Sequence, residues 1–208
     1  YMLGVWLKKK TGWAILNPLL VAIIVVIAFL SVFHIEYKEY NRGAVYLGYF
    51  LTPATVCLAI PLYKQLELLR QHLIAVASAI VAGVAGSVGS IYVMCRFFQL
   101  EHTHYVTLLP KSITTAIGMG VSEEAGGIVT LTVISIIITG ILGNIIADWL
   151  FQIFKIEEPI AKGLALGTAA HAIGTAKALE LGEIEGAMSS LSIAVAGLLT
   201  VVVVPLMS

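Results

Sequence analysis

Long stretches without a charged side chain constrain the fold of this sequence most. A helix needs about 20 mostly apolar residues to cross a bilayer. Uncharged runs recur along the chain, within residues 11–36, 43–63, 73–95, 126–147, 163–176 and 186–208, and most of them approach this length. Only 12% of the residues are charged, whereas soluble domains average about 25%. The sequence therefore predicts an all-α, polytopic membrane protein that forms a single integral membrane domain over residues 1–208.

Two segments that lie 113 positions apart resemble each other and share a K-x-L-E-L ending, namely LTPATVCLAIPLYKQLEL (51–68) and LALGTAAHAIGTAKALEL (164–181). Prolines interrupt the first segment and glycines soften the second. Paired, interrupted helices are typical of transporters built from inverted repeats. We therefore predict a first repeat over about residues 1–98 and a second over about 105–208, with broken or re-entrant helices. Chance similarity and ordinary membrane packing are the alternatives.

The distribution of positive charge predicts how these repeats cross the membrane. Lysine- and arginine-containing segments at 8–10, 64–70 and 155–162 lie on the cytoplasmic side by the positive-inside rule. This holds if residues 112–122 dip into the membrane and return without crossing. The second copy then runs opposite to the first, and Lys177 lies on the outer side.

A second polar stretch, LLPKSITTAIGMGVSEEAGG (108–127), lies between apolar runs. Irregular backbone at membrane depth is tolerated where protein or water covers it, so we expect a re-entrant segment whose Thr114 and Thr115 bind substrate. The neighbouring carboxylates Glu123 and Glu124 repel each other, so one can keep its proton near neutral pH and serve proton coupling. The alternative is an exposed loop in which both carboxylates are solvated.

The second copy of the repeat carries the other candidate binding residues. Thr168, His171 and Thr175 follow each other at i, i+3 and i+7, so a continuous helix places them on one face. A break in that helix would expose backbone N–H groups and a positive helix end, which suit a carboxylate. Gly174 and Lys177 complete the predicted substrate-binding set, and His171 is also a candidate for proton coupling. A histidine packed against a neighbouring helix is the alternative.

Other functional classes lack support in the sequence. It contains no H-E-x-x-H, P-loop or G-x-S-x-G motif, so we predict no enzyme and no cofactor. Glu101, His102 and His104 have no matching ligand cluster, so no metal site is expected. Cys57 and Cys95 lie in apolar runs, where small buried side chains are expected rather than a disulfide. The formal net charge of zero gives no indication of a nucleic-acid partner.

Three motifs carry a resemblance to a known family: residues 108–127 as quoted above, TGILGN (139–144) and KGLALGTAAHAIGTAKALELGEIEGAMSSL (162–191). In these motifs the chain resembles the LrgB/CidB family, and the likeness extends from NPLL (17–20) to the C-terminus. Ala170 stands where serine is expected, and Ala116 stands where proline is frequent.

The resemblance implies two functions. One is an antiholin-like protein that works with a small LrgA/CidA-type membrane protein to control murein hydrolase activity and lysis. The other is transport of small carboxylates such as pyruvate, glycolate or glycerate, as in the related plastid glycolate/glycerate translocator. We expect a carrier, because a pore former has no need of paired broken spans, and antiholin behaviour can follow from transport. The expected location is the plasma membrane, or a plastid envelope in a plant, and a homodimer is a further expected assembly.

Overall fold

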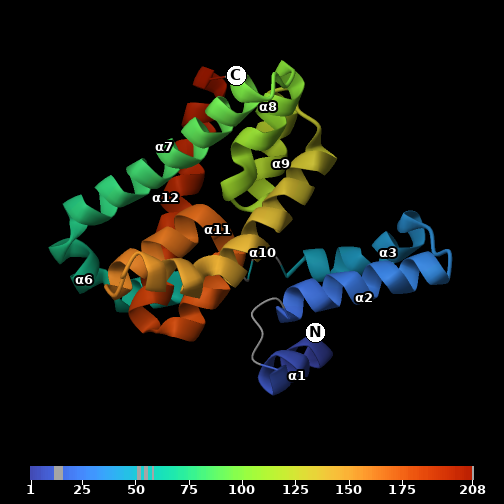
Figure 1. The fold of residues 1–208 in the computed structure, drawn as a ribbon, viewed down its shortest axis with the longest axis horizontal. Helices are drawn as coiled ribbons and strands as arrows, with labels where there is room; N and C mark the ends of the chain where they lie inside the picture. Colours follow the sequence, from blue (N-terminus) through green and yellow to red (C-terminus); the bar gives the residue numbers. More distant parts are fainter. Residues whose placement is uncertain (12–15, 51–52, 54–55, 58, 208) are drawn as a thin grey trace. The chain divides into compact units, whose positions relative to one another are not determined.

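The computed structural model describes residues 1–11, 16–50, 53, 56–57 and 59–207 (Figure 1). The chain divides into two compact units, Tyr1–Ala59 and Ile60–Ser208. Secondary structure in the described residues is helical throughout. This confirms the all-α, membrane-protein class predicted from the sequence, and each unit is considered by itself below.

The first unit contains three described helices. They are α1 (Met2–Thr11), α2 (Pro18–Val32) and α3 (Tyr37–Gly48). Helix α1 packs closely on the start of α2, because a Cβ atom at Gly4 would lie 2.7 Å from the Cα atom of Pro18. The apolar part of α2 is shorter than a full membrane span. Leu51 and Thr55, which contribute to the first copy of the repeat, lie outside the described residues.

The remaining described helices lie in the second unit, except that the first residue of α5, Ala59, belongs to the first unit. They are α5 (Ala59–Lys64), α6 (Leu66–Gln71), α7 (Leu73–Phe97), α8 (His102–Leu108), the 3-10 helix η1 (Leu109–Ser112), α9 (Thr115–Glu124), α10 (Val129–Ile153), α11 (Pro159–Leu181) and α12 (Glu183–Met207). Among the described residues, three helices are long and apolar enough to cross a membrane: α7, α10 and α12. The uncharged run 163–176 forms no such span, because it lies in α11, which is broken.

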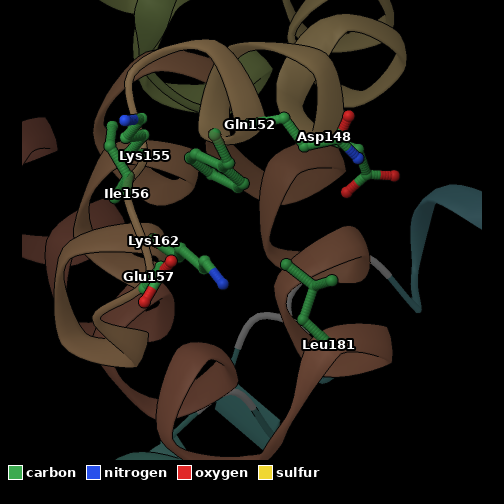
Figure 2. A pocket seen from close by; sticks show the side chains of 8 residues that line it. Asp148, Gln152, Lys155, Ile156, Glu157, Lys162 and Leu181 are labelled. Carbon is green, nitrogen blue, oxygen red and sulfur yellow. The ribbon is translucent and has the colours of Figure 1, made fainter.

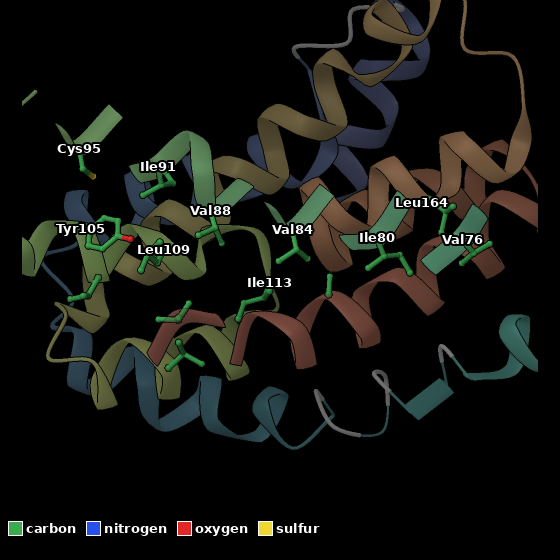
Figure 3. Close-up of a cluster of buried hydrophobic side chains, with 14 of the residues drawn as sticks. Val76, Ile80, Val84, Val88, Ile91, Cys95, Tyr105, Leu109, Ile113 and Leu164 are labelled. Atoms are coloured by element: carbon green, nitrogen blue, oxygen red, sulfur yellow. The ribbon is translucent and has the colours of Figure 1, made fainter. Parts of the chain in front are cut away.

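Helix α7 supplies one side of the apolar core of this unit. Its buried residues recur every three or four positions and are Val76, Ile80, Val84, Val88, Ile91 and Cys95 (Figure 3). Burial of Cys95 confirms the expectation for that residue, whereas Cys57 is exposed. Lipid is as apolar as these side chains, so burial alone drives helix association weakly in a membrane. Close packing and internal hydrogen bonds therefore determine how α10, α11 and the shorter helices assemble.

Helices α8, η1 and α9 form a hairpin, called here the first hairpin. Its base is fixed to the start of α10, because Thr132 Oγ1 lies 2.6 Å from Ser122 Oγ and 2.9 Å from the Thr107 carbonyl oxygen. Its tip, residues 109–115, lies beside the middle of α7, where Ser112 Oγ is 2.8 Å from Ser87 Oγ. The chain therefore enters to about mid-span and returns, as the sequence predicts for residues 112–122.

Helix α11 forms a second hairpin, because it breaks at His171, where φ is 43° and ψ is −136°. A Cβ atom at Gly174 would clash with the carbonyl oxygen of Leu166. In a straight helix these residues would be about 12 Å apart along the axis, so the second half of α11 folds back against the first. The broken helix expected in this stretch is present, and the tip of this second hairpin is residues 170–172.

The two hairpins enter the second unit from opposite ends. Thr107 contacts Thr132 near the start of α10, so the first hairpin enters at the end where α7 finishes, called here the α8 end. Lys177 pairs with Asp148 near the finish of α10, at a distance of 2.7 Å. The second hairpin therefore both enters and returns at the opposite end, where α6 leads into α7, called here the α6 end.

This placement corrects the topology expected from the sequence. The sequence predicts that the second K-x-L-E-L segment lies on the opposite side from the first, with Lys177 outside. In the structure α6, which carries the end of the first segment, and Lys177 both lie at the α6 end. The prediction is wrong because α11 turns back at His171 instead of crossing. An internal repeat is not evident in the described residues.

Cysteine labelling tests this corrected topology. Gln65→Cys and Leu181→Cys, each in a background without Cys57 and Cys95, should react with an impermeant thiol reagent from the same side of sealed vesicles. Gln65 is half-buried beside α6 and Leu181 is exposed at the end of α11, so both are accessible positions. Labelling from opposite sides would restore the inverted arrangement.

Candidate functional site

The tips of the two hairpins meet near the middle of the second unit. Ile136 of α10 lies against both hairpins. Its side chain packs on Gly118 of α9, where an added Cβ atom would meet it, and its carbonyl oxygen lies 2.9 Å from His171 Nε2 at the second tip. Ser112 of the first tip and Thr168 of the second hairpin also line one small cavity against α7 and α12. Two predicted binding segments, separated by about 50 residues of sequence, are thus brought together.

His171 is the residue at which α11 breaks. Its Nε2 atom lies 2.9 Å from the Ile136 carbonyl oxygen, and because a carbonyl only accepts, Nε2 donates. Gly140 makes room for the ring, since a Cβ atom there would lie 2.7 Å from His171 Cε1. The side chain is buried. A positive φ is rare for a residue with a Cβ atom and is typical of strained, functional positions.

The break separates the three side chains that the sequence places on one helical face. Thr168 packs against Gly83 of α7 and donates to the Leu164 carbonyl oxygen. Thr175 lies 2.7 Å from Ser189 Oγ of α12, whereas His171 contacts α10. The prediction that these three side chains share one helical face is therefore wrong. The three residues instead surround the second tip and contact three different spanning helices.

A lysine outside the predicted binding set, Lys111, lies at the first tip. Lys111 Nζ is 3.1 Å from Ser112 Oγ and 3.3 Å from Ser87 Oγ. Ser87 belongs to a run of small residues at helical spacing on α7, which predicts only helix packing. Neither residue could be chosen from local sequence, because their contact joins positions 24 apart.

Thr114 and Thr115 lie where α9 begins, at the first tip. Both are half-buried, and Thr114 is the N-cap residue but makes no capping hydrogen bond through its side chain. The amide groups of the first turn of a helix lack partners within the helix and carry a partial positive charge. The second half of α11 also begins at a tip, so two helix N-termini lie at mid-span.

Of the remaining predicted site residues, Lys177, Glu123 and Glu124 lie away from the tips, whereas Gly174 packs beside the second tip. Lys177 forms an ion pair with Asp148 at the α6 end, and Gly174 provides the close approach within α11 described above. A cavity of about 410 Å³ opens beside this ion pair, lined by Asp148, Gln152, Lys155, Glu157, Lys162 and Leu181 among others (Figure 2). Glu123 and Glu124 are exposed at the end of α9. This agrees with the alternative interpretation of residues 108–127, in which both carboxylates are solvated. Proton coupling through them stays a prediction.

Comparison with known proteins gives one consistent family. The profile of the LrgB-like family matches residues 1–208. Antiholin-like protein LrgB of Bacillus mycoides (strain KBAB4) is 40% identical over 199 residues, which cover 96% of this chain and 86% of that protein. Antiholin-like protein LrgB of Bacillus cereus (strain B4264) is 39% identical, also over 199 residues that cover 96% of this chain and 86% of that protein. No solved structure matches the chain.

Proposed function

The chain belongs to the LrgB-like family, and from this premise we propose that it carries small organic carboxylates across the cell membrane in an antiholin-like role. The observation that supports a carrier best is the meeting of two hairpins from opposite ends at mid-span. A site between such tips can be opened toward either side by moving one hairpin. A passive pore has no need of this arrangement.

The chemistry of the tips suits a small anion. Two helix N-termini direct partial positive charge toward the middle of the unit, an arrangement that transporters use for anionic substrate groups. Thr114 and Thr115 at one tip and Thr168, His171 and Thr175 around the other offer hydrogen-bonding groups. Pyruvate, glycolate and glycerate are the solutes proposed, with His171 as the candidate for exchanging a proton during transport.

The antiholin-like role has the more direct support from the comparisons, since the relatives carry it in their names. In this role the protein would work with a small LrgA/CidA-type membrane protein to restrain murein hydrolase activity and lysis. The two proposals are compatible, because control of lysis can be a consequence of moving a metabolic acid across the membrane.

Uptake by purified protein in liposomes tests the carrier proposal. Radiolabelled pyruvate, glycolate and glycerate should each be compared with protein-free liposomes, and at least one should show saturable uptake that its unlabelled form suppresses. An inward proton gradient should accelerate this uptake if a proton accompanies the solute. Absence of saturable uptake for all three acids would refute the carrier proposal.

The antiholin-like role is tested separately, in a bacterial host that lacks its own LrgB-type protein. Expression of the wild-type chain should lower murein hydrolase activity and delay lysis. A variant that is folded but inactive in transport should fail to do so if lysis control follows from transport. A transport-inactive variant that still delays lysis would separate the two roles.

A further inference from the structure

Lys111 carries a positive charge at mid-span without an anionic partner. Its ammonium group contacts the hydroxyl oxygens of Ser87 and Ser112. Within the described part of the chain, no carboxylate lies at ion-pair distance from it. Lys177, by contrast, is paired with Asp148 at the end of the unit. Ionisable side chains within membranes are costly and usually pair with an opposite charge or mark a solute path.

The two hydroxyl groups satisfy part of the hydrogen-bonding capacity of the ammonium group but none of its charge. An ammonium group has three N–H donors, and two of them have partners here. The N-terminus of α9 begins three to four residues further along the same tip, at Thr115. This places a second source of positive potential near Lys111. The first tip therefore combines two sources of positive potential, and among the described residues no anionic group pairs with Lys111.

We propose that Lys111 pairs with the carboxylate of the transported solute, and that the Ser87 and Ser112 hydroxyls donate hydrogen bonds to the same carboxylate. This inference rests on the carrier function proposed above and identifies the residue that recognises the acid group. A single ammonium group matches one carboxylate, so the site selects monocarboxylates over dicarboxylates. The remaining hydroxyl or keto group of the solute then faces Thr168, which lines the neighbouring cavity.

The described conformation has this site closed. The cavity beside Ser87, Ser112 and Thr168 measures about 10 Å³, which is room for about one water molecule. A three-carbon acid cannot enter while Ser112 Oγ remains 2.8 Å from Ser87 Oγ. Solute binding therefore requires that the first tip separate from α7.

Substitution of Lys111 tests this assignment in the liposome assay. Lys111→Gln keeps a hydrogen-bonding group without the charge, and should raise KM for the carboxylate about tenfold or more, the loss expected for a charge-assisted hydrogen bond. Lys111→Arg should retain part of the uptake. Lys38→Gln, at an exposed lysine of α3, is the matched control. A Lys111→Gln carrier with the wild-type KM would overturn the inference and leave the carrier function standing. Lack of uptake by the wild-type protein would refute the carrier function itself.

Chemical restoration of the charge separates recognition from folding. Lys111→Cys, in a background without Cys57 and Cys95, should show a raised KM like that of Lys111→Gln until it reacts with 2-aminoethyl methanethiosulfonate, which attaches an ammonium group of nearly lysine length and should lower the KM again. Methyl methanethiosulfonate, which attaches a neutral group, should leave the KM raised. Equal behaviour with the two reagents would overturn the role of the charge, since the same protein sample is compared before and after each reaction.

Discussion

His171→Ala is expected to reduce carboxylate uptake by about five- to 150-fold, the effect of losing one buried hydrogen bond of about 1–3 kcal/mol. The imidazole group lies at the break of α11, in contact with Ile136 of α10. Nε2 donates to that carbonyl oxygen, which leaves Nδ1 to accept a hydrogen bond or a proton at the second tip. Uptake in liposomes measures the loss, and thermal unfolding of the purified protein reports whether the fold persists.

The backbone at His171 complicates that experiment, and a glycine variant resolves it. Alanine at a φ of 43° is strained, by about 1–3 kcal/mol for such positions, so His171→Ala could lose uptake by losing the break. Glycine adopts positive φ freely. His171→Gly should therefore be more stable than His171→Ala and remain inactive if the imidazole group takes part in transport. A fully active His171→Gly carrier would limit the role of this residue to the break itself.

Composition and apolar runs were sufficient to predict the helical membrane class. The positions of two interruptions were also predictable, because polar and small residues gather at 108–127 and 164–181 in a chain that is otherwise apolar. The location of the second break was not. No residue is predicted for it from the sequence, and the structure places the positive φ at His171 while Gly174 allows close approach within the hairpin. The sequence indicates the segment in which the helix can break, but the residue at which it breaks depends on contacts with neighbouring helices.

The sequence predicts that the segment forming α11 crosses the membrane, and the length of its uncharged run explains why this prediction is wrong. The uncharged run 163–176 extends over about 21 Å as a helix, which is shorter than the hydrocarbon core of about 30 Å. Charge bias alone cannot distinguish a short crossing from a hairpin that returns, because Lys177 and its neighbouring glutamates give no clear sign to either side. A half-length apolar segment with an internal polar cluster is better interpreted as re-entrant, as residues 112–122 were.

The candidate site could be predicted only in part because its contacts are long-range. Thr168, His171 and Thr175 were chosen for a shared helical face, and the structure instead brings them to three different helices. The sequence does not indicate Lys111 and Ser87, although they form a polar contact between the first tip and α7. Spacing within one segment predicts neighbours along a helix, whereas the partner of a hairpin tip depends on how deep the hairpin enters.

A disulfide between the first tip and α7 should stop transport reversibly. Ser87→Cys and Ser112→Cys, combined in a background without Cys57 and Cys95, place two sulfur atoms where the native oxygen atoms are 2.8 Å apart. Disulfide geometry requires a sulfur–sulfur distance of about 2.05 Å with moderate Cβ separation, so oxidation should join the helices with little movement. The locked tip cannot leave α7, and uptake should fall at least about tenfold below that of the reduced protein, since a site with room for about one water excludes the solute.

A second pair of cysteines at the base of the same hairpin is the matched control. Ser122→Cys and Thr132→Cys also replace hydroxyl groups in contact, at 2.6 Å, but they join α9 to α10 where the base is already fixed by Thr107. Oxidation of this pair should leave uptake close to the reduced level, whereas dithiothreitol should restore uptake only in the tip pair. Undiminished uptake by the oxidised tip pair, with the crosslink verified by mass spectrometry, would mean that the solute passes without separating Ser112 from Ser87. The path would then have to lie outside the closed cavity at the two tips.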